Sequence, residues 1–455
     1  MYKRQDILRC VKKLQTVKEL ISGAAGINTL ISDSQFRSYL QGICSILTKD
    51  LENYESELVQ TGMDSQKLEE INTDLIKLKD LLWHIEYDRI IVSQSVGELL
   101  GGRTGDRFIE ILLTVQQVLT GLDRLEVRGR DSAGIHLMIQ NHGLDLMNPG
   151  VRQEIEHRTA DLNYKSGSVR ILDNALSFVY KVASEIGELG DNTQELRKLI
   201  LSDDLFYRAL ENENVTAVAI GHSRWASYGI ISEPNTHPMN SELLESEDSP
   251  FVVAAANGDV DNFADLKRVR NLQIPKLITS DSKVIPALIS NELSSQHGSP
   301  LDLDEAFRKT VQTLDGSIAI IANTGLKPEK LYMALRGSGQ GLYIGLSDEA
   351  YVIASEPYGL VEATDSYLRL NGETLPNRND SVSGNGEIVS VSLNQPVAVQ
   401  SLKRIAYDGT PLPITDNEFT QAEITTRDID RRNFPHFLLK EIYESPQSFE
   451  KTLRG

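Results

Sequence analysis

Arg224 and Trp225 form the first of several short motifs whose residue types could do chemistry. They follow the apolar run 215–220, which has the length of a strand, and they stand in a loop. An arginine at a strand end can grip a carboxylate with two parallel N–H donors, while a neighbouring indole covers the bound group. A surface arginine stacked on a partly buried tryptophan is an equally familiar cation–π contact. The spacing alone leaves both interpretations open.

Asn257-Gly258 and Asp281 are the next candidates. Asn257-Gly258 follows the six apolar residues 251–256. An asparagine amide and a glycine N–H can together stabilise the oxyanion of a tetrahedral intermediate. Asn-Gly after a strand is also the commonest hairpin turn. Asp281 lies in Ser-Asp-Ser at 280–282 just before an expected helix, so it could bind a substrate ammonium or cap that helix.

The histidines and cysteines suggest less. His222 and His237 flank the loop of the first motif, and a lone histidine in such a place is more often a packed, hydrogen-bonded group than a catalyst. The two cysteines of the chain are Cys10 and Cys44. Two cysteines cannot form a disulfide framework or a thiolate zinc site by themselves.

The composition excludes several classes of protein. The 455 residues hold 46 Lys and Arg against 65 Asp and Glu, for a formal net charge of −19. With a pI near 4.9, the chain is not expected to bind nucleic acid, which needs a basic face. No run of about 18 apolar residues occurs, and no secretory signal opens the chain, so no membrane span is expected. A reduced cytoplasmic setting is the default expectation.

Two stretches have the periodicity of helices. Within 68–85, apolar residues recur at spacings of three and four, which predicts one buried helical stripe: Leu68, Ile71, Leu75, Leu78, Leu82 and Ile85. The region 168–210 also has apolar residues at helical spacing, from Ile171 to Leu189, and predicts a second helical stretch.

Short apolar runs closed by turn residues predict strands beyond residue 214. These runs are 215–220, 251–256, 318–322, 331–335, 342–346, 351–354 and 388–393. Turn signals at 337–339 and 347–349 favour antiparallel pairing of the strands beside them. Asp302, with Glu305 three residues later, predicts the capped start of a helix. Strands gathered with flanking helices indicate an α+β domain with one sheet packed on another.

Taken in order, these motifs resemble one enzyme family. They are Arg-Gly-Arg-Asp-Ser-Ala-Gly at 128–134, Gly-His-Ser-Arg-Trp-Ala-Ser-Tyr-Gly at 221–229, Ser-Glu-Pro-Asn-Thr-His-Pro at 232–238, Asn257-Gly258, and Ser-Asp-Ser at 280–282. Asp-Gly-Ser at 315–317, Ala-Leu-Arg-Gly-Ser at 334–338 and His-Phe-Leu-Leu-Lys-Glu-Ile-Tyr-Glu-Ser-Pro at 436–446 extend the match. The series resembles the glutaminase domain of glutamine–fructose-6-phosphate aminotransferases. The resemblance implies an N-terminal-nucleophile hydrolase αββα sandwich, enlarged here by helical insertions.

The resemblance implies a role for each matching residue. Arg224 would bind the α-carboxylate of L-glutamine, and Asp281 would bind its α-ammonium. Asn257 and the Gly258 N–H would stabilise the oxyanion. Glutamine would be hydrolysed to glutamate and ammonia, and the ammonia would convert fructose 6-phosphate to glucosamine 6-phosphate in a partner half of the protein.

The loop that carries Trp225 would close over bound glutamine and exclude water. Ser227 and Tyr228 stand at positions that line the pocket in this family. Tyr228 departs from the histidine that is more usual at this position in the family. The glycines 337, 339 and 341 lie between two expected strands and open no helix, so a phosphate-cradling role is not expected.

The family's nucleophile is a cysteine at the mature amino terminus, with its own α-amino group as base. This sequence begins Met-Tyr-Lys-Arg-Gln. We therefore expect a chain cut at both ends, with residues 1–5 non-native, that is inactive as given. Cys44, buried in an apolar stretch, would be an alternative nucleophile only if processing unmasked it, and Cys10 is a weaker candidate. The competing hypothesis is a non-catalytic module that binds glutamine or holds an oligomer together.

The resemblance also divides the chain. Residues 1–120 are expected to be a helical insertion, and 121–405 the glutaminase domain with a second helical insertion at about 142–213. Residues 406–455 would be a linker toward a sugar-isomerase half, which alone would bind fructose 6-phosphate. We expect a cytoplasmic homodimer that acts on L-glutamine, with no cofactor, no metal, no nucleic acid and no membrane among its partners.

Overall fold

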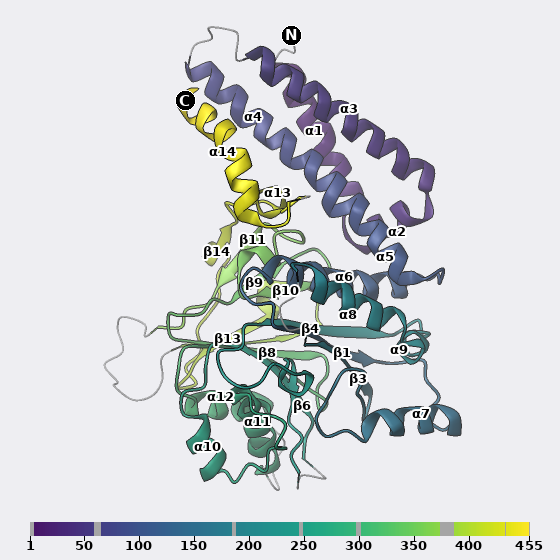
Figure 1. Cartoon of the computed structure of the whole chain (residues 1–455), viewed down its shortest axis with the longest axis vertical. Coiled ribbons are helices and arrows are strands. Elements are labelled where there is room, and N and C mark those ends of the chain that lie inside the picture. The colour runs from purple at the N-terminus through teal and green to yellow at the C-terminus, as the bar shows by residue number, and fades with distance from the viewer. Residues whose placement is uncertain are drawn as a thin grey trace. The chain divides into compact units, whose positions relative to one another are not determined.

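The computed structural model describes residues 4–58, 65–183, 188–244, 249–296, 302–373, 386–432 and 434–454. The chain divides into two compact units, one formed by residues 1–116 with 423–455 and one formed by 117–422 (Figure 1). Residues 1–3, part of the start that was expected to be non-native, lie outside the described residues. No helix among the described residues is long and apolar enough to cross a membrane.

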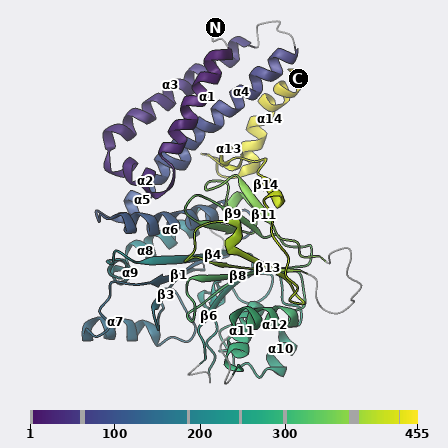
Figure 2. The same ribbon diagram turned by 180° about the vertical axis from the view of Figure 1, so that it is seen from behind.

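The first unit is helical, and α1, α3 and α4 run side by side in both views (Figures 1 and 2). Its elements are α1 (Arg4–Leu20), α2 (Gly23–Ser32), α3 (Ser34–Leu58), α4 (Ser65–Trp83), a π-helical segment (His84–Ile91), α5 (Val92–Leu100), the start of α6 (Asp106–Leu125), α13 (Thr426–Ile429) and α14 (Phe437–Arg454). The apolar stripe predicted over 68–85 is confirmed, since its members from Ile71 to Ile85 are buried in one core cluster.

The segment after residue 422 packs with the amino-terminal helices. Thr426 donates a hydrogen bond from Oγ1 to Oδ2 of Asp88 at 2.6 Å, and both side chains are buried. Arg427 forms an ion pair with Asp80 of α4 at 3.1 Å. Cys44 lies in the middle of α3, fully buried in the same core cluster. Burial raises the pKa of the Cys44 thiol to about 11, so nothing in its surroundings activates it as a nucleophile.

The second unit combines three antiparallel sheets with helices. Sheet A has the order β2-β3-β1-β4, sheet B the order β13-β12-β8-β7-β6-β5, and sheet C the order β10-β9-β11-β14. The strands are β1 (Ser132–Gln140), β2 (Val169–Leu172), β3 (Ala175–Val182), β4 (Thr216–Arg224), β5 (Met239–Asn240), β6 (Val252–Asn257), β7 (Ile318–Thr324), β8 (Lys330–Arg336), β9 (Tyr343–Leu346), β10 (Tyr351–Ala354), β11 (Ser366–Arg369), β12 (Glu387–Ser392), β13 (Leu402–Ala406) and β14 (Phe419–Gln421).

Helices lie on the outer faces of sheets A and B. The α-helices of this unit that follow β1 are α7 (Pro149–Thr159), α8 (Asp191–Leu201), α9 (Asp204–Ala209), α10 (Phe263–Val269), α11 (Val284–Ser294) and α12 (Leu303–Thr313). Side chains of β1 and β4, such as Met138 and Ile220, share one core cluster with Ala255 and Met333 of sheet B. A second cluster joins the opposite face of sheet B to α11 and α12. The expected α+β class, with one sheet packed on another, is therefore confirmed.

Every strand predicted after residue 214 is present, but two local predictions are wrong. The helix expected over 168–210 begins as β2 and β3, and only α8 and α9 follow as helices. All eight residues of β3 are buried, so the strand lacks the alternation that distinguishes it from a buried helix. The turn at 337–339 makes no hairpin, because β8 pairs with β7 and β12 whereas β9 pairs with β10 and β11.

Two other local predictions are confirmed. The turn at 347–349 joins β9 to β10, which pair antiparallel. Asp302 caps α12, and its Oδ1 accepts the backbone N–H of Glu305 at 3.0 Å. These outcomes fit short-range rules, because a hairpin turn and a helix cap are both decided within four residues.

Candidate functional site

Arg224 is the last residue of β4, opposite Ser132 of β1, and only 5% of it is exposed. Its guanidinium donates to the backbone carbonyl of Tyr228 and to that of Ile230 at 3.3 Å. In this state the arginine therefore holds the carbonyl groups of its own loop. The alternative of a surface arginine stacked on Trp225 is wrong, because Arg224 is buried whereas Trp225 is 74% exposed.

Two carboxylates lie close to the Arg224 guanidinium. Burial lowers the pKa of Arg224, while the charges of Asp281 and Asp131 raise it. Asp131 also accepts the backbone N–H of Ala226 at 2.8 Å, which fixes the start of the loop. A buried guanidinium that feels the charges of two carboxylates offers partners for both a carboxylate and an ammonium group.

Asp281 is buried, with only 5% of its surface exposed. Its Oδ2 accepts the backbone N–H of Val260 at 2.7 Å, and its Oδ1 lies 3.4 Å from the Ser282 hydroxyl. The helix-cap alternative for Asp281 is wrong, because α11 begins at Val284 without a side-chain cap. The carboxylate instead ties the start of α11 to the chain just after Asn257-Gly258.

Asn257 ends β6, where it pairs with Ala319 of β7. Gly258 has φ +87°, and a Cβ at this position would stand 2.0 Å from the carbonyl oxygen of Ser317. The hairpin alternative is wrong, since β6 pairs with β5 and β7 and the chain after Gly258 continues to α10. The turn therefore requires glycine and leaves the Gly258 backbone close to a neighbouring strand.

The side chain of Asn257 points between the sheets. Val253, Ala255 and Asn257 alternate with Ala254 and Ala256, which face α11 and α12. On the facing sheet, His222 lies on the same side of β4 as Ile220 and Arg224 by the same alternation. His222 Nε2 lies 2.9 Å from Oδ1 of Asn257, so the Arg224 strand and the Asn257 strand meet at this hydrogen bond.

His222 and His237 are neighbours, with ring centroids 4.4 Å apart. The backbone N–H of Ala256 donates to Nδ1 of His237 at 3.4 Å. Burial lowers the pKa of His222 to about 4 and the pKa of His237 well below its ordinary value. Both rings are therefore neutral at physiological pH. The prediction that they are packed, hydrogen-bonded groups is confirmed.

The loop after Arg224 lies against the Asn257-Gly258 turn and the segment before α11. Ser227 donates from Oγ to Oδ1 of Asp259 at 2.6 Å. The Tyr228 ring packs on Phe263 with centroids 4.9 Å apart. The backbone N–H of Ile230 donates to Oγ1 of Thr279 at 3.0 Å. The structure thus brings the predicted residues Arg224, Ser227, Asn257, Gly258 and Asp281 into one region.

Sequence reasoning missed Asp131, Asp259 and Thr279, which hold the loop. Asp131 stands inside the motif at 128–134, and Asp259 directly follows Gly258, so proximity to recognised motifs was the available signal. Thr279 directly precedes the motif at 280–282, but its partner Ile230 is 49 positions away, so the contact itself could not be read from the sequence. Among the described residues, no group of three His, Cys, Asp or Glu side chains is arranged to hold a metal ion.

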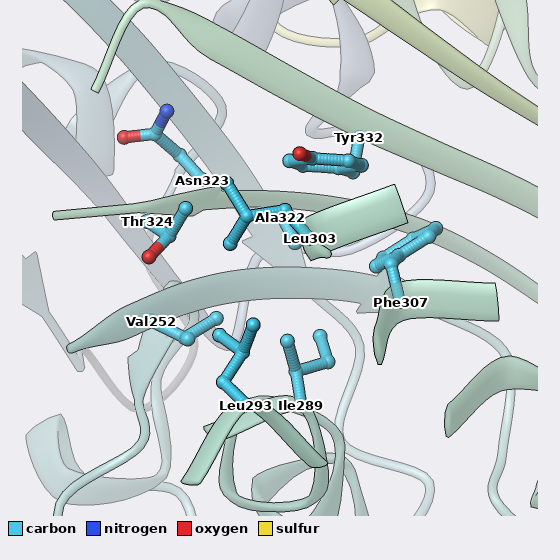
Figure 3. Close-up of a pocket in the computed structure, with 9 residues that line it drawn as sticks. All are labelled: Val252, Ile289, Leu293, Leu303, Phe307, Ala322, Asn323, Thr324 and Tyr332. Atoms are coloured by element: carbon cyan, nitrogen blue, oxygen red, sulfur yellow. The ribbon is translucent and has the colours of Figure 1, made fainter. Parts of the chain in front are cut away.

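A small apolar gap in the core lies apart from this region (Figure 3). It is lined by Val252, Ile289, Leu293, Leu303, Phe307, Ala322, Asn323, Thr324 and Tyr332. The gap belongs to the α11 and α12 side of sheet B, the face opposite to Asn257. Its lining is a packing feature of the core and offers no charged group to a ligand.

Comparison with known proteins gives similarities to enzymes that use glutamine. The chain is 28% identical over 330 residues to a glutamine–fructose-6-phosphate aminotransferase (isomerizing) of Bacillus cereus, covering 72% of this chain and 41% of the relative. A protein of the same name from Oceanobacillus iheyensis is 28% identical over 341 residues, covering 75% and 43%. That of Halalkalibacterium halodurans is 30% identical over 231 residues, covering 51% and 33%.

The chain spans about two fifths of the length of the first of these relatives. No protein-family profile matches it. Among solved structures, a glutamine phosphoribosylpyrophosphate amidotransferase from B. subtilis matches with TM-score 0.39 and 19% identity, covering 64% of this chain and 46% of that one.

Proposed function

We propose that residues 121–405, within the second unit, form the glutaminase half of a glutamine–fructose-6-phosphate aminotransferase. Similarity to proteins of that name over about three quarters of the chain supports the proposal. The observation that carries it is the meeting of the Arg224 strand and the Asn257 strand, with Asp281 within charge range of Arg224. These three side chains offer partners for the carboxylate, the ammonium and the amide of one amino acid.

The reaction is hydrolysis of the side-chain amide of L-glutamine. The bond between the amide carbon and nitrogen breaks, the oxygen of water bonds to that carbon, and nitrogen leaves as ammonia. Arg224 binds the α-carboxylate and Asp281 binds the α-ammonium through Oδ1, since Oδ2 already accepts from Val260. Asn257 and the Gly258 N–H stabilise the negative oxygen that develops on the amide carbon.

The loop must change its contacts when glutamine binds. A substrate carboxylate replaces the carbonyl groups of Tyr228 and Ile230 on the Arg224 guanidinium. A carboxylate is the better acceptor, because it carries a full negative charge and can take two parallel N–H···O bonds from the guanidinium, whereas a carbonyl oxygen carries only a partial charge. The freed loop then places Trp225 and Ser227 over the substrate and keeps water from the site.

The proposal extends to the fold and the assembly. The order helix, sheet, sheet, helix within residues 117–422 supports the N-terminal-nucleophile hydrolase sandwich. Residues 1–120 are then an insertion, as is the region 142–213 with its strands β2 and β3. Residues 406–455 lead toward a sugar-isomerase half that binds fructose 6-phosphate. We propose a homodimer as the working form.

Ligand-dependent thermal stability tests the site. A ligand that binds the folded state alone raises the melting temperature by mass action. L-Glutamine and L-glutamate should raise the Tm of this chain, and Arg224→Ala should abolish the rise. Arg268→Ala is the matched control, because Arg268 is an exposed arginine on α10 paired only with Asp265 at 3.1 Å. A chain whose Tm ignores both ligands would contradict the site assignment.

A second candidate function is a module that binds glutamine without hydrolysing it. Measuring glutamine binding alone does not distinguish this module from the glutaminase, since both would bind the α-carboxylate with Arg224 and the α-ammonium with Asp281. Ammonia release from L-glutamine by the complete gene product separates them. Release that disappears in Asn257→Ala supports the glutaminase, whereas binding without release supports the module.

A further inference from the structure

The amide of Asn257 is held by one neutral histidine. Nε2 of His222 lies 2.9 Å from Oδ1 of Asn257, a normal hydrogen-bond length. A ring nitrogen facing an amide oxygen must carry the proton, because the oxygen can only accept. His222 is neutral near pH 7, since burial lowers its pKa to about 4. With the Asn257 amide in this orientation, the single proton of the ring is on Nε2.

The consequence for Asn257 is a fixed orientation of its side chain. With Oδ1 occupied by His222, the amide NH2 group points away from the ring, and Nδ2 makes no hydrogen bond to any other described residue. An amide turned by 180° would place NH2 against Nε2–H, two donors facing each other, which is unfavourable. The Nε2–H tautomer of His222 thus selects the one orientation in which Asn257 can donate to a ligand.

His237 contacts the backbone of β6 next to Asn257 and also packs against the His222 ring. It accepts the Ala256 N–H at Nδ1, one residue before Asn257, and its ring lies 4.4 Å from that of His222. His237 is 3% exposed and follows the loop on the other side of Arg224. The end of β6 is therefore fixed through both its backbone and its side chain.

We propose that His222 is a positioning residue that aims the Asn257 amide at the side-chain carbonyl of bound glutamine. The proposal rests on the proposed function, and it adds a residue whose role is to act through Asn257. His222 does not touch the substrate. It sits two residues before Arg224 on the same face of β4, so one strand sets both the carboxylate clamp and the direction of the amide donor.

The ring tautomer tests the hydrogen bond without any ligand. Long-range ¹H–¹⁵N spectra of the ¹⁵N-labelled chain at pH 7 should give the Nε2–H tautomer for His222, assigned by its loss in His222→Gln. Asn257→Asp should raise the pH at which the His222 signal titrates, since a carboxylate favours the charged ring. An Nδ1–H tautomer, or a charged ring at pH 7, would overturn the proposal even if glutamine binds.

Glutamine binding tests the consequence. His222→Phe should weaken L-glutamine binding roughly three- to tenfold, the value of one hydrogen bond, whereas His222→Gln keeps a donor and should stay within about twofold. In an Asn257→Ala background, His222→Phe should cause no further loss, because the two residues act as a unit. Equal losses in both backgrounds would sink the positioning role.

His136→Gln is the matched control for this series. His136 is another buried neutral histidine on the same face of sheet A, and its Nε2 lies 3.0 Å from the Ser177 hydroxyl. It should lower the free energy of unfolding without changing glutamine affinity. If the unmutated chain does not bind glutamine, the proposed function fails while the tautomer experiment still decides the His222–Asn257 contact.

Discussion

Glu126 accepts a hydrogen bond from the backbone N–H of Gly190 at 2.6 Å, which ties the turn just before the motif at 128–134 to the start of α8. Glu126 is 1% exposed, and its Oε1 has no partner among the described residues. Burial raises the pKa of this carboxyl to about 7, the Gly190 N–H lowers it, and the charge of Asp123 raises it again. The Glu126 carboxyl therefore gains or loses its proton near neutral pH.

We predict that Glu126 makes the second unit less stable as pH rises. Its pKa is near 4.5 in the unfolded chain and about 7 in the fold, so between these values the folded state binds more protons and stability falls with increasing pH. The slope is at most about 1.4 kcal/mol per pH unit. Urea unfolding should show Glu126→Gln more stable than the parent at pH 8, with no such gain at pH 4.5.

Glu211→Gln is the control for this experiment, because Glu211 is exposed in the same unit. Its stability difference from the parent should be the same at both pH values. A pH-independent effect of Glu126→Gln would mean that the Glu126 carboxyl is not raised in pKa.

Acid should destabilise the second unit through its buried histidines. His136 is fully buried, and burial, with a smaller effect from Lys181, lowers its pKa to about 3. Between about pH 3 and 6.5 the unfolded chain binds the extra proton, so stability falls as pH falls below 6.5. His136→Gln should flatten that fall in urea unfolding measured from pH 7 to 4. The exposed His157→Gln should leave it unchanged.

Trp225 should report ligand binding by fluorescence. The chain has two tryptophans, and Trp83 stacks on Tyr87 in the first unit with ring centroids 3.8 Å apart. Trp83→Phe leaves Trp225 as the only emitter, 74% exposed without ligand. L-Glutamine should shift its emission to shorter wavelength as the loop buries the indole. The shift should be absent when Arg224→Ala is added, and a shift that survives this change would contradict loop closure driven by Arg224.

Gly258→Ala should destabilise the second unit strongly. The residue has φ +87°, and its new Cβ would meet the Ser317 carbonyl oxygen at 2.0 Å. The left-handed backbone alone costs about 1–2 kcal/mol, and the steric clash adds to it. Gly121→Ala in α6 is the control, since its Cβ would make an ordinary contact at 3.6 Å and should stabilise the helix by about 0.5–1 kcal/mol. Equal unfolding midpoints for the two variants would contradict this.

The strands β4, β6, β7, β8, β9, β10 and β12 of the second unit could be predicted because each is a short apolar run that ends at a turn. Residues 251–256 became β6 and 318–322 became β7, with bounds within two residues. The strands β2 and β3 were expected as a helix, and burial of β3 on both faces removes the alternation that marks a strand. The strands β1, β5, β11, β13 and β14 were not predicted. Which strands pair could not be read from local pattern, as the failed hairpin at 337–339 shows, because pairing depends on contacts far apart in sequence.

The candidate site could be predicted in composition but not in geometry. The motifs named Arg224, Asn257 and Asp281, and the structure brings them to one place. The sequence did not predict that the Arg224 guanidinium donates to the carbonyl groups of Tyr228 and Ile230, because these contacts depend on how the loop folds back onto β4. The packing of Thr426 on Asp88 was equally hidden, since 338 positions separate the two residues.

The carbonyl groups of Tyr228 and Ile230 on Arg224 have a consequence for selectivity. An anion that binds the Arg224 guanidinium must first displace these two carbonyl groups from it. A small ion such as acetate or chloride gains only the guanidinium and loses the two internal bonds, so it gains little. An amino acid that also engages Asp281 and Asn257 recovers more than it displaces. On the proposed function, the affinity of a ligand therefore depends on how many of these groups it satisfies together, whatever the width of the entrance.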